Sequence, residues 1–496
     1  MTPRGGGEPL TMLRLRRDAE LSVPPDAPDA LRVLYPLGEL PFPQKSPGMR
    51  TALTVLADGD VSEADLAALV VAGAGAAGLL QLHSLLRKLT MTGLLEHAVY
   101  VDGEPLARLV PLGRGLPSRP RRLDDDALLK LSRHAIVRAE GGVLVAQAPR
   151  SHFQVELSPP TMELVARLAD WTPAKQLLAD VTGIQEEALV QVLGLCVQAE
   201  LLATRGPEEE DPEEATLAQG QWSLPDLWQH ARSRGTRLST GFGGTYRFRD
   251  RFAALPAVPE PGPGVRVDLP VPSFTEIAAK DPSFTEVLEQ RRSIREHDAD
   301  SPITLAQLGE LLFRTARVRA VMESPDGQDV LDTPTPGGGA VHEIEIYPMV
   351  TDCAGLAPGL WHYRSGDHAL ELVAEPGPAT AALVAGARAT CLMDADPQVV
   401  LILAARFGRA AWKYESMSYA LTLKHVGVHY QTFYLVGTAM GLGVCGLGAG
   451  DAGDFALASG LDYYETGSVG ELVVGSRPPH LQDNAMTFTP MTRPQP

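Results

Sequence analysis

The chain has 496 residues, a formal net charge of -18 and 44% hydrophobic residues. This length favours two or three domains, and the composition is typical of a globular protein. The negative charge argues against nucleic acid as a partner, because phosphates would be repelled. The longest apolar run, residues 67–80, is shorter than the ~20 residues that a membrane-spanning helix needs. We therefore expect no membrane partner.

The N-terminus and the cysteines favour a cytoplasmic location. Residues 1–18 contain arginines but no continuous apolar segment, so a secretory signal is not expected. The four cysteines are far apart and form no Cys-x-x-Cys pair or Cys/His ligand spacing. We expect free thiols in a reducing compartment and no metal site.

Residues 1–29 are expected to be a flexible N-terminus, and residues 30–120 a first winged-helix-like domain. The run Ser62-Glu63-Ala64-Asp65 is typical of a capped helix start. Leucines at helical spacing predict a further helix over 79–90. A strand over 94–101, followed by the turn Asp102-Gly103, predicts a hairpin.

Residues 131–205 predict a second winged-helix-like domain. Gly141-Gly142 separates two short strands, residues 153–157 alternate apolar and polar, and three helices are predicted to begin near Pro160, Pro173 and Gln185. This order resembles PqqD-like domains, which bind leader peptides, so residues 131–205 are a peptide-binding candidate. A packing domain without a ligand and a DNA-binding domain are the alternatives. The candidate recognition helix over 185–199 has two glutamates and no Lys or Arg, which suits DNA poorly.

Residues 206–272 are predicted to be linkers that flank a connector segment. An acidic run covers 207–214, and a proline-rich run covers 255–272. Between them, residues 222–249 are basic and aromatic and include Gly243-Gly244-Thr245-Tyr246. We expect this connector to pack on the following domain, with a plain surface strap as the alternative.

Residues 273–496 alternate helices with strands, which predicts an α+β catalytic domain. Helices are expected over 281–290, 304–315 and 414–440, the last being the long central helix. Strands are expected over 343–347, 399–403 and 469–474.

Two segments early in this domain suit a phosphorylated cofactor with a flat ring. Arg291-Arg292-Ser293-Ile294-Arg295 offers guanidinium forks and a hydroxyl, which suit a phosphate and a ribityl chain. Pro334-Thr335-Pro336-Gly337-Gly338-Gly339 offers glycines that allow close backbone approach to a ring.

Two later segments complete the set. The glycine-rich run over 441–448 follows a predicted helix rather than a strand, so a Rossmann dinucleotide site is excluded. Lys413-Tyr414 stands at the predicted start of the long helix, where adjacent side chains can reach one pocket.

The order and spacing of these segments resemble the flavin-dependent nitroreductase superfamily over about residues 222 to 490, and Lys413-Tyr414 resembles its SagB-type azoline dehydrogenases. The resemblance implies an FMN domain whose central mixed or antiparallel sheet is flanked by helices, preceded by the two winged-helix-like domains. At Gly337 the family has a serine, so this chain lacks that hydroxyl. The residues implied for FMN binding are Arg291, Arg292, Ser293, Arg295, Pro336, Gly337, Gly338, Gly339, Gln431, Gly446, Leu447, Gly448 and Arg477, with surface or structural roles as the alternative for Gln431 and Arg477.

The resemblance also implies an activity, the oxidation of peptide thiazolines or oxazolines to azoles in ribosomal peptide natural-product biosynthesis. Lys413 or Tyr414 would take a proton while a hydride leaves to flavin N5, and both remain candidates for the base. The implied partners are an azoline-containing precursor peptide, a cyclodehydratase, dioxygen as electron acceptor and a second copy of the chain.

Three other functions are compatible with parts of the sequence. A related flavin oxidase or a nitro or quinone reductase would use the same cofactor residues, but a general reductase would have no use for a peptide-binding half. A non-catalytic scaffold or peptide-binding subunit is disfavoured by the intact arginine, glycine and Lys-Tyr segments. A winged-helix regulator is disfavoured by the acidic charge.

Overall fold

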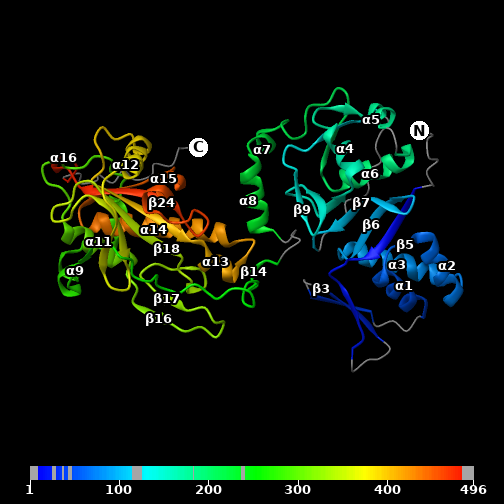
Figure 1. Cartoon of the computed structure of the whole chain (residues 1–496), viewed down its shortest axis with the longest axis horizontal. Helices are drawn as coiled ribbons and strands as arrows, with labels where there is room; N and C mark the ends of the chain where they lie inside the picture. The colour runs from blue at the N-terminus through cyan, green and yellow to red at the C-terminus, as the bar shows by residue number, and fades with distance from the viewer. Residues whose placement is uncertain are drawn as a thin grey trace, which may run out of the picture. The chain divides into compact units, whose positions relative to one another are not determined.

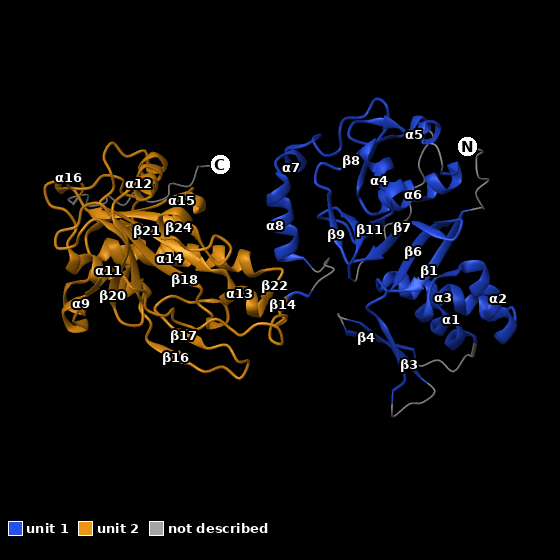
Figure 2. Ribbon diagram, viewed as in Figure 1, with its two compact units in different colours: residues 1–242 blue, residues 243–496 orange. Residues whose placement is uncertain are grey.

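The computed structural model describes residues 9–24, 30–35, 38–42, 47–113, 126–181, 184–235 and 241–482. The chain divides into two compact units, residues 1–242 and 243–496 (Figures 1 and 2). The second unit therefore begins at Gly243, earlier than the predicted domain start at residue 273. Parts of the predicted N-terminus, first domain, connector and C-terminus lie outside the described residues. Within the described part of the chain, no helix is long and apolar enough to cross a membrane.

Unit 1 is built on a seven-stranded antiparallel sheet in the order β5-β1-β6-β7-β11-β10-β9. Its strands are β1 Leu10–Leu15, β5 Val61–Ser62, β6 Leu95–Val101, β7 Glu104–Pro111, β9 Ile136–Glu140, β10 Val143–Gln147 and β11 Phe153–Leu157. The prediction of a flexible N-terminus was wrong for the described part, because β1 pairs with both β5 and β6.

Two smaller sheets and eight helices complete the described part of unit 1. The strands are β2 Glu20–Ser22, β3 Leu31–Tyr35 and β4 Gly38–Phe42 in one sheet, and β8 Leu128–Leu131, β12 Thr172–Pro173 and β13 Leu202–Arg205 in the other. The helices are α1 Pro47–Asp58, α2 Glu63–Ala74, α3 Gly78–Met91, α4 Pro159–Ala166, α5 Ala174–Asp180, α6 Glu186–Gln198, α7 Leu217–Gly220 and α8 Leu224–Arg234.

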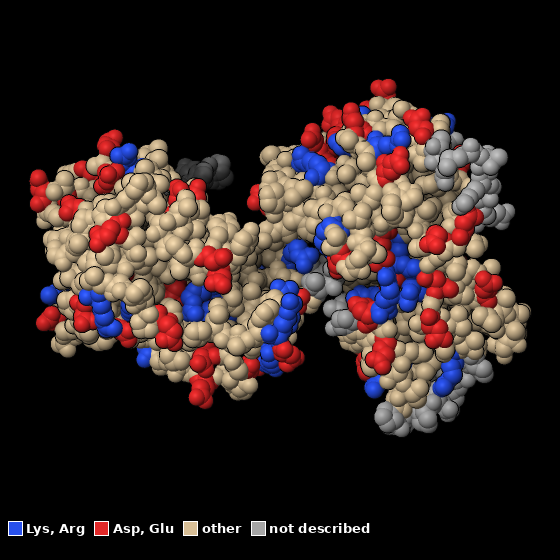
Figure 3. Space-filling view, in the orientation of Figure 1, with Lys and Arg blue, Asp and Glu red and all other residues tan. Residues whose placement is uncertain are grey.

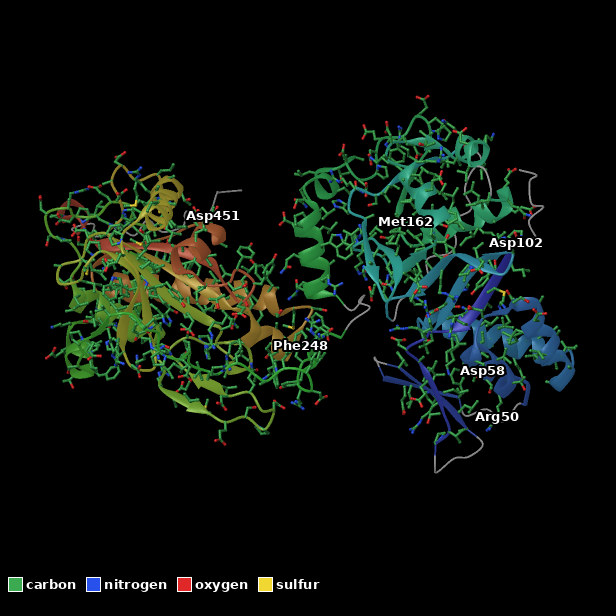
Figure 4. All side chains as sticks on the ribbon, in the orientation of Figure 1. Arg50, Asp58, Asp102, Met162, Phe248 and Asp451 are labelled. Atoms are coloured by element: carbon green, nitrogen blue, oxygen red, sulfur yellow. The ribbon has the colours of Figure 1, made fainter. Side chains whose placement is uncertain are left out.

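Local sequence signals in unit 1 produce the predicted elements. The Ser62 side chain accepts a hydrogen bond from the Asp65 N–H and caps α2. Asp102, labelled in Figure 4, and Gly103 both have positive φ, 52° and 81°, as the two-residue turn between β6 and β7 requires. The three predicted helices after residue 157 are α4, α5 and α6.

The two predicted winged-helix domains share one sheet rather than standing apart. Strand β7 pairs with β11 in a register that places Leu109 opposite Val155. Side chains of the β6-β7 hairpin, including Val99, Leu106 and Leu109, belong to the same core as α4, α5 and α6. Four consecutive residues of β7, 106–109, are buried, because both faces of this strand are covered. The hairpin is therefore an interior part of unit 1 and not an exposed wing.

The predicted acidic linker packs onto unit 1. Lys130 Nζ donates to Asp211, the Arg133 backbone N–H donates to Glu213, and the Arg133 guanidinium lies 3.1 Å from Glu214. These contacts attach the run over 207–214 to the region of β8, because opposite charges face each other there. Residues 206–235 are therefore part of unit 1 instead of a free linker.

Unit 2 has an antiparallel seven-stranded sheet in the order β15-β20-β19-β18-β21-β24-β23. The strands are β15 Arg266–Asp268, β18 Ile344–Val350, β19 Gly359–Arg364, β20 Ala369–Ala374, β21 Val399–Arg406, β23 Leu442–Gly446 and β24 Thr466–Ser476. Two short pairs lie outside it, β14 Gly243–Gly244 with β22 Tyr414–Glu415, and β16 Ala320–Met322 with β17 Val330–Asp332.

Helices cover both faces of this sheet, which confirms the predicted α+β class. They are α9 Phe274–Lys280, α10 Phe284–Gln290, α11 Leu305–Ala316, α12 Pro378–Cys391, α13 Phe407–Lys413, α14 Ser418–Ala439, α15 Ala452–Ser459 and α16 Pro479–Gln482, with a 3-10 turn at Gly338–Ala340. One core contains side chains of α11 and α14, and a second core contains side chains of α12 and α15. Every residue of β21 is buried, as its continuous apolar run predicts.

The long central helix begins at Ser418 rather than at the predicted residue 414. Ser416 has a φ of 64°, in the left-handed region that a right-handed helix cannot include. Tyr414 and Glu415 are extended and pair with Gly244 and Gly243. The Lys413-Tyr414 pair therefore lies at a break between α13 and α14.

Replacing Leu109 by Ala tests whether unit 1 is one cooperative core. Leu109 is 1% exposed, so we expect a loss of about 2–5 kcal/mol in the free energy of unfolding. Because its core includes α6, hydrogen exchange followed by mass spectrometry should show faster exchange in residues 186–198 as well as in β6. Leu80→Ala, at a leucine that is 80% exposed, is the matched control. Unchanged protection of α6 in Leu109→Ala would contradict the shared core.

Candidate active site

Lys413 and Tyr414 converge on the glycine loop that precedes β18. A Cβ atom built on Gly339 would collide with Tyr414 Oη and would lie 2.8 Å from Lys413 Nζ. Gly339 also has a φ of 59°, which favours glycine. Both predicted catalytic side chains therefore end at the backbone of one predicted cofactor segment, although the two segments are far apart in sequence.

The other two glycines of this loop are required by close neighbours. A Cβ at Gly337 would lie 2.8 Å from the His342 ring, and a Cβ at Gly338 would lie 2.6 Å from Leu421. His342 thus occupies the space next to the position where the family has a serine. Pro336 is exposed at the start of the loop.

A buried Glu-His pair holds the loop. His425 Nε2 accepts a hydrogen bond of 2.7 Å from the Gly338 N–H, so the ring proton is on Nδ1, which donates to Glu343 Oε1 at 2.8 Å. Glu343 is fully buried. Burial raises the pKa of Glu343, but its interactions with His425 and Thr422 together lower it further, so the net pKa is below the ordinary value. The carboxylate fixes the histidine, and the histidine fixes the loop.

Tyr414 is held in its neutral form. Burial raises the pKa of the phenol, and the negative charge of Glu343 raises it further. The sequence left Lys413 and Tyr414 both as candidates for the base. The structure places the tyrosine where its hydroxyl is a hydrogen-bond donor near neutral pH.

The predicted arginine segment forms a second cluster with the strand β23. Ser293 Oγ is 2.9 Å from Tyr434 Oη. Tyr434 Oη also accepts a hydrogen bond of 2.7 Å from the Gly446 N–H. The Arg291 guanidinium lies over the Tyr434 ring, and the Ile294 N–H donates to Val444 O at 3.0 Å. Tyr434 of α14 therefore joins the arginine segment to the glycine-rich run.

A cavity of about 950 Å³ opens beside this cluster. Arg292, Ser293, Arg295 and Arg477 line it together with residues 392–396. Burial lowers the pKa of Arg477, and the nearby Arg292 guanidinium lowers it further. The guanidiniums can donate to an anion, in a wall that also carries the carboxylates of Glu296, Asp352, Asp394 and Asp396.

The residues present fit FMN. The guanidiniums and the Ser293 hydroxyl suit a phosphate and a ribityl chain. The glycine loop brings backbone groups next to Lys413 and Tyr414. Helix α14 contacts both clusters, through His425 and Tyr434, which are nine positions or about 13 Å apart along a helix. One elongated cofactor can therefore reach from one cluster toward the other.

Other predicted FMN residues are placed differently from expectation. The N–H groups of Gly446 and Leu447 donate to Tyr434 Oη and to Glu471 O, so these two backbone donors are already used within the protein. Gln431 is exposed on α14, and Gly448 is exposed after β23. The structure brings neither of these two residues into either cluster.

Four residues of the site were missed by the sequence analysis. Glu343 and Tyr434 gave no signal, because each acts through a partner far away in sequence. His425 was treated as structural, and its role in holding the loop depends on Glu343. Tyr246 was noted only as part of the connector, although its backbone N–H donates to Lys413 O.

Glu343→Gln tests the buried pair. We expect the free energy of unfolding at pH 7 to fall by about 1–3 kcal/mol, because a hydrogen bond to a buried charge is weakened. Since folding lowers the pKa of Glu343, its contribution is complete above the unfolded pKa near 4.5 and declines as the pH falls below it. Urea unfolding at several pH values should show the variant approaching the wild type in acid, with the exposed Glu289→Gln as control. A difference that does not change with pH would contradict this linkage.

Comparisons with known families match three successive parts of the chain. Residues 12–116 match the ThcOx helix turn helix domain, residues 129–239 match the cyanobactin oxidase ThcOx, and residues 288–475 match the nitroreductase family. The first match confirms the helix-turn-helix type of the N-terminal region, beginning within the segment predicted to be flexible.

A nitroreductase of Methanocaldococcus jannaschii is 28% identical over 186 residues, which are 38% of this chain and 86% of that protein. A nitroreductase of Ralstonia eutropha has a TM-score of 0.34 and 20% identity, over 48% of this chain and 98% of its own. A chain of the Escherichia coli microcin synthetase complex McbBCD has a TM-score of 0.33 and 20% identity, over 53% of this chain and 98% of its own. The family matches in sequence carry the assignment: the chain is an oxidoreductase of the nitroreductase superfamily and, with its cyanobactin-oxidase-type N-terminal regions, a SagB-type dehydrogenase.

Proposed function

We propose that this chain uses FMN to oxidise thiazoline or oxazoline rings of a ribosomally made peptide to azoles. The observation that carries the proposal is the convergence of Lys413 and Tyr414 on the backbone of Gly339. The matches to a cyanobactin oxidase support a peptide as the substrate.

The Lys-Tyr pair would remove the proton of the substrate. Conversion of an azoline to an azole removes a proton from the ring carbon next to a carbonyl group, and a hydride from the neighbouring carbon. When bound, FMN supplies the acceptor for the hydride at N5, and dioxygen takes the electron pair afterwards. Because the raised pKa of Tyr414 keeps its hydroxyl protonated, we assign Tyr414 the role of the hydrogen-bond donor that orients the ring, and Lys413 the role of the base.

The arginine cluster would hold the FMN phosphate. Arg292 and Arg477 at the cavity wall provide charge, and Ser293 provides a hydroxyl. We propose that two copies of the chain form a dimer in which each flavin is bound between the copies, as the superfamily resemblance implies.

The N-terminal unit would hold the peptide, which a cyclodehydratase would supply with azolines already formed. A cavity of about 480 Å³ in this unit is lined by His134, Leu202, Trp222 and Leu227, among others. The wall mixes apolar side chains with polar and charged ones, among them Arg150, Glu200 and Glu213, so it offers both apolar contacts and hydrogen bonds to a peptide segment. The proposed peptide-binding region, residues 131–205, contributes most of this wall.

Arg292→Ala should weaken FMN binding about tenfold or more, because a charge-assisted hydrogen bond to the phosphate is lost. Fluorescence titration of the flavin-free protein with FMN measures the dissociation constant. Riboflavin, which lacks the phosphate, should bind both proteins equally. Arg266→Ala, at an arginine on the opposite edge strand β15, is the matched control. Equal FMN affinity of Arg292→Ala and wild type would remove this residue from the cofactor site.

Lys413→Ala should lower kcat on an azoline peptide by about 10²–10⁴-fold with FMN still bound, because the base is lost. Tyr414→Phe should cause a smaller loss, since the phenol acts as a donor. The readout is the two-dalton mass loss of the peptide, and Lys424→Ala and Tyr419→Phe are controls on the exposed side of α14. Unchanged turnover in both active-site variants would remove the pair from the reaction. If the protein reduced nitro compounds with a nicotinamide cofactor as electron donor and did not oxidise the peptide, a general reductase would be supported instead.

A further inference from the structure

The segment over 243–252 contacts the Lys413-Tyr414 pair at several points, although it lies outside all three ranges that match known families. Its strand β14 pairs with β22, so that Gly244 is opposite Tyr414. The Tyr246 N–H donates to Lys413 O at 3.2 Å, and Thr245 Oγ1 donates to Glu415 at 2.8 Å. The backbone on both sides of the catalytic pair is therefore held by this segment.

One side chain of the same segment, Tyr246, lies near the Lys413 ammonium. The Lys413 ammonium lies 5.8 Å from the centre of the Tyr246 ring and 5.6 Å from the centre of the Tyr414 ring. The Tyr246 ring also makes an edge contact with Trp412, whose Nε1–H donates to Phe252 O. Two aromatic rings thus flank the ammonium, an arrangement that attracts a cation.

The Tyr246 hydroxyl contacts the carboxylate of Asp326. Tyr246 Oη donates to Asp326, which lies between β16 and β17, and Arg249 lies 3.3 Å from the same carboxylate. The pKa of Asp326 is lowered, first by the hydrogen bond from Tyr246 and then by the charges of Arg249 and Lys413. Burial and the bond to Asp326 raise the pKa of Tyr246 to about 12, and its hydroxyl remains a donor.

Tyr246 adopts a backbone conformation that is unusual for a tyrosine. Its φ is 53°, in the left-handed region, where a bulky side chain is disfavoured. The surrounding hydrogen bonds must therefore compensate for this conformation. Phe248, labelled in Figure 4, lies in the same segment, and Figure 3 shows basic and acidic side chains together at the end of unit 2 that contains β14.

We propose that Tyr246 and Asp326 are positioning residues that orient the Lys413 amine and set the pH at which it becomes a base. The inference rests on the proposed function in assigning Lys413 to proton removal. The charged and titratable groups around the amine are Tyr246, Asp326 and Arg249 on one side, Tyr414 and Glu343 on the other, and the Glu415-Arg247 ion pair beside β22.

The test measures the titration of Lys413 directly, and so needs no substrate. The full-length, FMN-loaded protein is treated with a trace of acetic anhydride over a range of pH, and acetylation of Lys413 is measured by mass spectrometry. Exposed Lys424 serves as the internal reference. The variants are Asp326→Asn and Tyr246→Phe, and Tyr464→Phe, at a tyrosine that is 86% exposed, is the matched control.

Asp326→Asn should lower the pH of half-maximal labelling of Lys413 by about 0.5–1 unit, because an opposite charge near the ammonium is removed. Tyr246→Phe should shift it in the same direction, since the carboxylate loses the bond that orients it. Lys424 should not change, and the pH of half-maximal kcat on an azoline peptide should move with Lys413.

The inference would be overturned if Lys413 had the wild-type pH of half-maximal labelling in both variants. It would also be overturned by an equal shift at Lys424, because that would indicate a change of the whole protein. The proposed function would fail separately if the Lys413→Ala variant kept full turnover. In that case the pH dependence of Lys413 labelling could still differ between Asp326→Asn and the wild type.

Discussion

The pairing of Gly243-Gly244 with Tyr414-Glu415 is the constraint on which the candidate site depends. A continuous helix through residues 413 and 414 would point the two side chains about 100° apart. The left-handed backbone at Ser416 prevents such a continuous helix. The extended backbone at 414–415 then needs hydrogen-bond partners outside a helix. The connector segment supplies them, and as a result both side chains reach Gly339.

Buried charges hold the surrounding backbone in the same way. Arg409 is fully buried, and its guanidinium donates to the carbonyl groups of Leu255, Asp329 and Val341. It thereby joins the proline-rich run at Leu255, the loop before β17 and the end of the glycine loop. A buried guanidinium without partners would be strongly unfavourable, so this set of contacts tends to form or be lost together. The Glu343-His425 pair adds a second such point beneath Gly338.

Local signals in the sequence predicted most elements, because they depend on neighbouring residues. The cap at Ser62, the turn at Asp102-Gly103 and the apolar strand over 399–403 required no knowledge of the remainder of the fold. The shared sheet of unit 1 could not be predicted in this way. The burial of both faces of β7 depends on β11, some fifty positions later, and the pattern of β7 alone also fits the wing of a separate domain.

The candidate site shows the same division between local and distant information. Arg291-Arg292-Ser293 and Lys413-Tyr414 were identifiable as motifs, because the functional groups of these residue types indicate which chemistry they can perform. The effects of distant residues on these motifs could not be identified from the sequence. The protonation state of Tyr414 depends on Glu343, and the surroundings of Lys413 depend on Tyr246 and Asp326. A motif thus indicates which groups can react, whereas the distant residues that contact it determine the pH and the geometry at which they do so. In the proposed oxidation, which would remove a proton from a weakly acidic ring carbon, that second set of residues would decide whether the motif is active.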